Sequence, residues 1–446
     1  MSDETLIKAE KDFTEILDKE LPQIDELIKS DFQSGLDQLF SLEKQTRQAS
    51  DLASSKRVLI KIVNVTRKSG NWKLMNEQVQ LLSKKHGQLK QAITTMIQEV
   101  IKYLDEAPDL ETKIETIENI RTVTEGKIYV EVERARVSRT LSHIKEEQGD
   151  IDAATDILGE LQVETYGSMD IREKTEFILE QVQLYIKKGD FTQAQILSRK
   201  IVPRYFNKEE VHDLKLRYYE LLIKISLHNS QYLDVCQHYR AIYDTPLVIK
   251  DENKWKDALE NIVYFITLAP YDNLQSDLIH KIVLDSRLQS LPVHYELIKC
   301  FTVDELMRWP KVSEIYGPPL QKTPVFDQST AEGKVRWDDF RKRVIEHNLR
   351  VISKYYTRIR TAKLNKLLDL SEKETEEFIS KLVTQGTIYA RINRPERVVT
   401  FAKPKDSNEV LNEWSHNIAT LLSHIETIGH LISKDEMVNG IKPKVK

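Results

Sequence analysis

The sequence predicts an almost entirely helical protein: a right-handed solenoid of helical hairpins, similar to tetratricopeptide repeats, followed by a small module with two strands and a long C-terminal helix. Long proline-free tracts separate Pro22, Pro108 and Pro203. They leave room for uninterrupted helices, because proline breaks helix interiors. Apolar residues within these tracts recur at steps of three and four, as in Ile178, Val182 and Ile186, which is the helical period.

A pair made of a polar residue and an apolar residue returns about every 40 positions. The steps between successive pairs are 40, 38, 41, 40 and 41 residues. The polar residue can cap a new helix and the apolar one can anchor it against its neighbour. A unit of this length holds two antiparallel helices, and stacked units form a solenoid, which we expect over residues 1–290. The pairs are Asp31-Phe32, Asn71-Trp72, Asp109-Leu110, Asp150-Ile151, Asp190-Phe191 and Gln231-Tyr232.

Composition is that of an ordinary globular chain. Of 446 residues, 40% are hydrophobic and 30% charged, and the net charge of −4 gives no overall attraction to nucleic acid or anionic membrane. Cys236 and Cys300 are the only cysteines, which argues for a reducing compartment. The N-terminus does not resemble a secretory signal, and the longest apolar stretch, 262–271, is too short to cross a bilayer. We therefore expect a protein of the cytoplasm and nucleus.

The C-terminal third changes its pattern. Residues 317–333 contain three prolines and are predicted to form a loop, and residues 334–359 a long helix. A short helix is expected at 361–369. Ser371 and Glu374 then form a capping-box pattern at the start of a helix that stops at Gly386.

Two strand-like runs follow, at 388–392 and 398–401, joined by a turn-rich segment. Two helices and then a β-hairpin are the order of a winged helix, which we expect at about 360–405. A two-stranded hairpin leaves backbone donors and acceptors unpaired at its edges, so we expect it to pair with a neighbouring chain. The candidate interface residues of the hairpin are Ile388, Tyr389, Arg391, Ile392, Val398, Val399 and Phe401.

The last segment, 406–446, repeats apolar residues at alternating steps of three and four, which is a heptad seam. A surface helix that packs on its own domain is one interpretation. Coiling with helices of other chains is the one we favour, because the seam continues well past the hairpin. The seam residues are Leu411, Trp414, Ile418, Leu421, Ile425, Ile428 and Ile432.

Several strings resemble those of PCI-domain subunits of the 26S proteasome lid. They are Leu306–Pro310, Arg343–Arg350, Leu367–Phe401, Lys84–Leu89, Leu161–Met169 and Asn412–His416. The resemblance covers essentially the whole chain and implies helical repeats, a PCI domain at 291–405 and a C-terminal helix that enters a shared bundle. It also implies a non-catalytic scaffold in a hetero-oligomer. The implied partners are other PCI subunits of the lid, the lid deubiquitinase, and neighbouring base or core-particle subunits.

Patterns for catalysis are missing from the sequence. No two of the 13 glycines lie closer than eight residues apart, which excludes a dinucleotide fingerprint and a Walker A loop. The 11 histidines include no His-x-His and no His-Glu-x-x-His. His416, His424 and His430 fall on one predicted helix and are interpreted as exposed polar positions rather than as metal ligands. We expect no enzyme, cofactor or metal.

Two alternatives stay open. One is a PCI subunit of a related complex, of the COP9 signalosome or translation initiation factor type. The other is a winged-helix nucleic-acid-binding protein, because residues 334–366 hold eleven Lys or Arg against three acidic residues. However, Glu372, Glu374, Glu376 and Glu377 lie near the start of the helix that would enter a DNA groove, and they would repel the phosphate backbone. We therefore expect no nucleic-acid and no membrane partner.

Overall fold

The computed structural model describes residues 13–440, which fall into two compact units. Unit 1 extends to Ala258 and unit 2 starts at Leu259. The domain boundaries expected near 290 and 405 stay predictions. Within the described residues, no helix is both long and apolar enough to cross a membrane.

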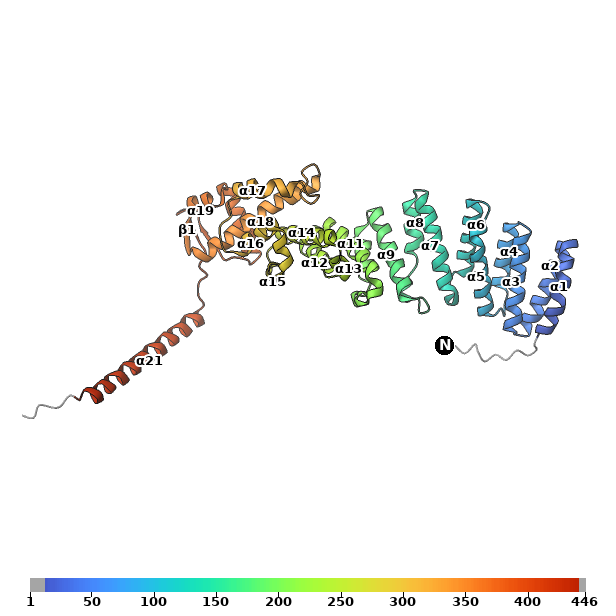
Figure 1. Cartoon of the computed structure of the whole chain (residues 1–446), viewed down its shortest axis with the longest axis horizontal. Coiled ribbons are helices and arrows are strands. Elements are labelled where there is room, and N and C mark those ends of the chain that lie inside the picture. The colour runs from blue at the N-terminus through green and yellow to red at the C-terminus, as the bar shows by residue number, and fades with distance from the viewer. Residues whose placement is uncertain (1–12, 441–446) are drawn as a thin grey trace, which may run out of the picture. The chain divides into compact units, whose positions relative to one another are not determined.

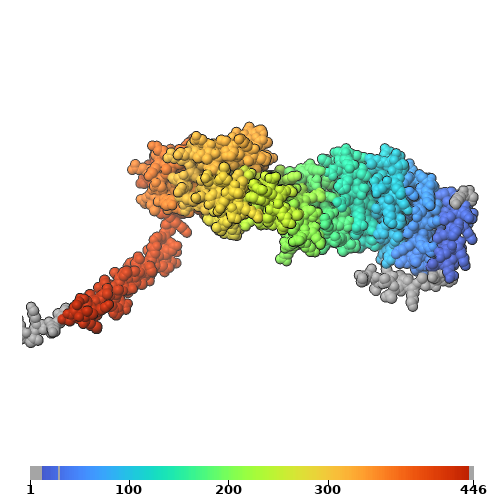
Figure 2. All heavy atoms as spheres, viewed as in Figure 1, coloured from blue at the N-terminus to red at the C-terminus, as the bar shows by residue number. Residues whose placement is uncertain are grey.

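Unit 1 is a row of helical hairpins (Figure 1). Most helices pack on the next one along the chain, and α3 also packs on α5, α4 on α6 and α9 on α11, so that successive hairpins stack. In the space-filling view, side chains fill the gaps between neighbouring ribbons (Figure 2). The helices are α1 (Thr14–Ser30), α2 (Phe32–Gln48), α3 (Leu52–Lys68), α4 (Trp72–Lys84), α5 (Lys90–Tyr103), α6 (Leu110–Thr124), α7 (Glu131–Glu147), α8 (Ile151–Gly159), α9 (Ile171–Lys188), α10 (Phe191–Ser198), α11 (His212–His228), α12 (Tyr232–Tyr243) and α13 (Pro246–Ile249).

The repeated polar–apolar pairs mark the helix starts as expected. Each even-numbered helix from α2 to α12 begins at the apolar member of one pair. The side chains of Asp31, Asn71, Asp150 and Asp190 each accept a hydrogen bond from a backbone N–H in the first turn of the helix. Asp109 makes no such bond, and neither does Gln231. The predicted solenoid of helical hairpins is therefore confirmed, and four of its six repeat positions carry a side-chain cap.

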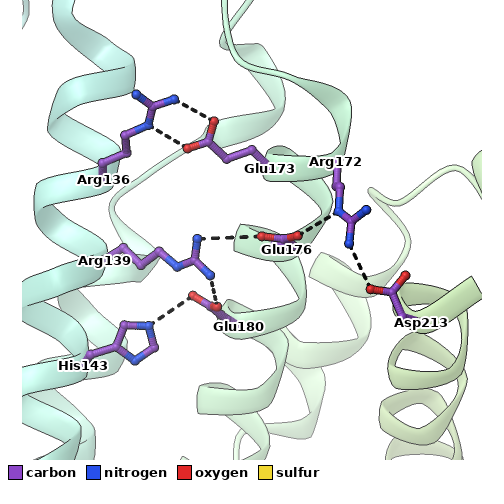
Figure 3. Close-up of polar contacts among 8 residues, drawn as sticks. All are labelled: Arg136, Arg139, His143, Arg172, Glu173, Glu176, Glu180 and Asp213. Atoms are coloured by element: carbon purple, nitrogen blue, oxygen red, sulfur yellow. Dashed lines mark hydrogen bonds and ion pairs between the residues drawn. The ribbon is translucent and has the colours of Figure 1, made fainter. Parts of the chain in front are cut away.

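Polar side chains join successive repeats of the solenoid. Arg136 on α7 donates two hydrogen bonds to Glu173 on α9, at 2.7 and 3.0 Å (Figure 3). Arg139 binds Glu180 about one turn further along α7 and two turns further along α9. On the other side of α9, Arg172 donates to Asp213 of α11 at 3.0 Å. The partners are 37 to 41 residues apart, about one repeat, so each contact fixes one hairpin against the next.

Unit 2 is built around α18, whose Phe340, Val344 and Leu349 are fully buried. The side chain of Asn348 holds the loop before α17, because it accepts from the N–H of Met307 at 2.9 Å and donates to its carbonyl oxygen at 2.6 Å. The elements are α14 (Glu252–Leu268), which contains the boundary between the units, α15 (Asn273–Val283), α16 (Pro292–Thr302), α17 (Trp309–Gln321), α18 (Ala331–Tyr355), β1 (Arg358–Arg360), α19 (Thr361–Leu368), α20 (Glu372–Thr384), β2 (Arg391–Asn393), β3 (Val398–Thr400) and α21 (Ser407–Asn439).

Two sequence predictions for this unit are wrong in part. The loop expected from residue 317 starts later, since α17 continues through Pro318 and Pro319 to Gln321. Both prolines lie in the last turn, and burial of Tyr316 and Leu320 holds that turn in place. The helix expected to reach residue 359 ends at Tyr355, because the chain turns there into a strand.

Candidate assembly surfaces

One helix of the winged helix, α20, begins at capping residues that are visible in the sequence. Ser371 and Glu374 form the predicted capping box at the start of α20, each side chain bonding the backbone N–H of the other. Buried side chains of α19 and α20, among them Leu364, Ile379 and Leu382, pack with the sheet into one core. The predicted order of helices and hairpin is therefore confirmed.

The sheet has three strands rather than the two expected. Its order is β1-β3-β2, with both pairs antiparallel, so β3 lies in the centre. β1 lies where the sequence predicts the end of a helix, although its Arg358-Ile359-Arg360 pattern alternates. Burial of Ile359 between two exposed arginines is the period-two signal that could have identified the strand.

The seven predicted hairpin residues do not share one surface. Ile388 and Tyr389 lie before β2, and Phe401 follows β3. Ile388, Val399 and Phe401 are buried in the core of the winged helix itself, and Ile392 and Val398 are half-buried. Only Tyr389 and Arg391 are exposed. Of the seven residues, only these two can therefore contact a partner chain through exposed side chains. Pairing with a partner strand would otherwise have to use backbone hydrogen bonds at a sheet edge.

The register shows which backbone groups face the free edge of β2. Phe401 donates to Thr357 and Thr361 donates to Arg397, so the antiparallel alternation makes Ile359 and Val399 a hydrogen-bonded pair. The N–H and C=O of Val399 therefore point to β1. Its neighbours in β3 point to β2, which leaves the N–H and C=O of Ile392 pointing outward. No strand among the described residues pairs with this edge, and a shallow hollow lined by residues 391–395 runs beside it.

The C-terminal helix α21 presents the second surface. Asp406 and Glu409 form a capping box at its start, and Lys405 binds Glu413 at 2.5 Å. The helix has 33 residues and is about 50 Å long. None of its residues is buried (Figure 2). The seam residues keep 43–66% of their surface exposed; they are Leu411, Trp414, Ile418, Leu421, Ile425, Ile428 and Ile432.

An apolar seam of this length is unusual on an exposed helix. Apolar patches that large on soluble proteins mark interaction sites. Exposure of every seam residue disfavours the interpretation in which α21 packs on its own domain. His416, His424 and His430 also lie exposed along α21, and no group of three or more possible metal ligands occurs in residues 13–440.

The basic stretch between residues 334 and 366 is partly neutralised within the chain. Arg336, Lys342, Arg343 and Lys354 each form an ion pair with a carboxylate. The start of α20 stays acidic, with Glu374 in the capping box. A phosphate backbone would therefore meet a partly neutralised basic stretch beside a negative helix end.

The two cysteines lie in different surroundings. Cys236 is buried, and burial raises the pKa of its thiol to about 12. Cys300 is half-buried, with its Sγ 3.8 Å from the hydroxyl oxygen of Tyr316. Neither thiol forms a disulfide.

Three family profiles match successive parts of the chain. They are described as the PSMD12/CSN4 N-terminal family at residues 34–251, the PCI domain at 299–403, and the 26S proteasome regulatory subunit RPN5 C-terminal domain at 408–440. The 26S proteasome regulatory subunit RPN5 of Saccharomyces cerevisiae is 56% identical over 446 residues, which cover both chains completely. The regulatory subunit rpn501 of Schizosaccharomyces pombe is 49% identical, covering 98% of this chain and 99% of its own. The 26S proteasome non-ATPase regulatory subunit 12 of Dictyostelium discoideum is 40% identical, covering 99% and 98%.

Proposed function

The chain belongs to the family of 26S proteasome regulatory subunits that includes RPN5 and non-ATPase regulatory subunit 12, and we propose that it is a non-catalytic scaffold of the lid. In that role it supports ubiquitin-dependent protein degradation by assembling with other PCI subunits and with the lid deubiquitinase. Base or core-particle subunits are further neighbours in this proposal, and the cytoplasm and nucleus are its compartments.

The observation that carries the proposal is the uncovered seam of α21. A helix needs burial of an apolar face for most of its stability in a protein. In α21 the seam side chains are exposed along the whole length, as the Trp414 and Ile418 positions illustrate. Helices of neighbouring subunits would supply the missing burial, and the alternating steps of three and four fit knobs-into-holes packing with such helices.

The free edge of β2 supports the same role. An edge strand with outward backbone groups is a template for a strand of another chain. Ile392 supplies one outward N–H and one outward C=O, and Arg391 and Tyr389 would flank the added strand with exposed side chains. The edge would thus set the order of PCI subunits, while the helix seam would add apolar area.

Purification of the tagged full-length chain from cells, followed by mass spectrometry of co-purifying proteins, tests the proposal. Lid subunits in fixed proportion are the expected result. The control is the same chain ending at residue 405, which lacks α21 and should lose these partners. Recovery of signalosome or initiation-factor subunits, or of nuclease-sensitive RNA or DNA, in place of lid subunits would contradict it.

A further inference from the structure

A cleft in unit 2 contains a charged group that the fold does not neutralise. The cleft lies between α15, α16 and α18 and has a volume of about 230 Å³. Arg350 lines it, and its guanidinium stacks on the ring of Tyr271, with the central carbon 3.8 Å from the ring centroid. Within residues 13–440 the guanidinium forms no hydrogen bond and no salt bridge, although Arg350 is half-buried. Stacking on Tyr271 covers one face of the guanidinium and leaves its N–H donors, which point outward in the plane, available.

The other charges at the cleft are already paired. Lys354 contacts both carboxylate oxygens of Asp304 at 2.8 Å. Glu346, the carboxylate nearest to Arg350 along α18, instead binds Arg343 at 2.5 Å and Lys381 at 3.4 Å. The cleft therefore has one uncompensated positive charge. Its burial lowers the pKa of Arg350, which shows that the charge is poorly solvated.

We propose that this cleft binds the carboxylate of an acidic side chain from another polypeptide, with Arg350 as the residue that recognises it. The two oxygens of a carboxylate can accept two parallel hydrogen bonds from the planar guanidinium of arginine. The single negative charge of the carboxylate would also balance the one uncompensated positive charge of the cleft. A phosphate dianion fits less well, because it brings two charges and would lie near Asp304.

The size and walls of the cleft favour a side chain over a small molecule. Sites for small-molecule ligands usually measure about 300–1,000 Å³, and this cleft is smaller. Ile279, Phe301 and Val351 line it beside the charged groups and would contact the methylene groups of a glutamate stem. That the acidic side chain belongs to a neighbouring subunit rests on the proposed function, whereas the carboxylate specificity of the cleft does not.

His347 provides a reporter next to the site. It is 3% exposed, donates from Nε2 to the carbonyl oxygen of Glu305 at 3.2 Å, and its Nδ1 has no hydrogen-bond partner. Burial and the charge of Arg350 lower the pKa of His347 to about 4. A carboxylate bound to Arg350 would cancel part of that charge and shift this pKa upward, whereas a neutral ligand would not.

The test is a nuclear magnetic resonance titration of the full-length chain with ¹⁵N-labelled histidine, in which His347→Gln assigns the reporter signal. The probes are N-acetyl-glutamate amide, its neutral match N-acetyl-glutamine amide, and acetate. We expect a saturable shift of the His347 signal with the glutamate probe, at a Kd on the order of 10 mM for one charge-assisted contact. The glutamine probe should cause none, and acetate should bind more weakly.

Substitutions then test Arg350 itself. Arg350→Gln should weaken glutamate binding at least about tenfold, and Arg350→Lys should weaken it because lysine lacks the fork. Arg341→Gln removes an exposed arginine of the same helix outside the cleft and should bind like the unmodified chain. Thermal melts establish that each variant is folded, and Arg350→Lys serves if Arg350→Gln does not fold.

Four outcomes would overturn the proposal: equal shifts with both amides, no saturable shift, acetate binding as tight as glutamate binding, or unchanged glutamate binding by folded Arg350 variants. None of these outcomes depends on assembly into a complex, so failure here is distinct from failure of the scaffold function.

Discussion

Introducing two aspartates into the seam of α21 should block assembly without destabilising the free protein. The double change Ile418→Asp with Ile425→Asp places charges one heptad apart on the same face. Both side chains are exposed in the free chain, by 43% and 55%. Exposed substitutions usually change the free energy of unfolding by less than about 0.5 kcal/mol, so the melting temperature should stay within about 2 °C of the unmodified value.

The expected loss at an interface between subunits is much larger. Full burial of an isoleucine side chain contributes about 1.5–3 kcal/mol, and roughly half of that surface is still available in each of these two residues, which gives about 2 kcal/mol together. Burying two carboxylates without partners adds to this cost. A total of about 3 kcal/mol or more weakens binding at least about 100-fold. Competition between tagged variant and untagged chain for incorporation into the lid measures this ratio.

A matched control separates the seam from the helix. His416→Asp with Ser423→Asp puts the same charges at the same seven-residue spacing, on the opposite face of α21. This variant should melt and assemble like the unmodified chain. The reasoning fails if the seam variant melts well below the control, since α21 would then pack on its own chain, or if it is incorporated as well as the control.

Three further predictions concern the edge strand, a buried histidine and the repeat caps. Ile392→Pro should weaken incorporation into the lid more than Ile392→Ala, because proline removes the outward N–H while both changes remove the side chain; equal incorporation of the two folded variants would argue against strand pairing. His347 has its pKa lowered to about 4 in the folded state, so the unfolded state binds more protons between about pH 4 and 6.5. The contribution of neutral His347 to the free energy of unfolding is therefore complete above pH 6.5 and is lost as the pH falls, by about 2 kcal/mol at pH 5. Urea unfolding at pH 7 and pH 5 should show a smaller drop in the free energy of unfolding for His347→Gln than for the unmodified chain. Asp150→Ala should cost about 1 kcal/mol in the same assay, whereas Asp109→Ala, at the equivalent repeat position but with no cap bond, should cost close to nothing.

Local chemistry made most of the helical fold predictable. The pairs such as Asp190-Phe191 combine a cap and an anchor, and both act within one turn of the helix that they start. The capping box at Ser371 and Glu374 is equally local. Such signals are visible in the sequence because the residues that interact are close together along it.

Features that depend on distant segments were not predictable in the same way. Whether the chain near Ile359 forms a helix or a strand depends on pairing with Val399, 40 residues later, and the helical period of α18 hid the change. Likewise, Val399 and Phe401 look like ordinary edge-strand residues until pairing with β1 makes β3 the central strand and the helices bury their side chains in the core of the winged helix. The candidate interface therefore moved from the side chains of the hairpin to the outer backbone edge of β2.

The cleft at Arg350 shows the same limit for function. In the sequence, Arg350 is one of eleven basic residues between 334 and 366, and nothing distinguishes it from Arg343. The structure separates the two through their partners, because Arg343 binds Glu346 and Arg350 stacks on Tyr271, 79 residues earlier in the chain. A basic stretch is therefore a poor guide to a binding surface until each charge has been assigned its partner. Arg350 lines a cleft and has no carboxylate partner there, so it is the basic residue of this stretch that we expect to recognise a ligand.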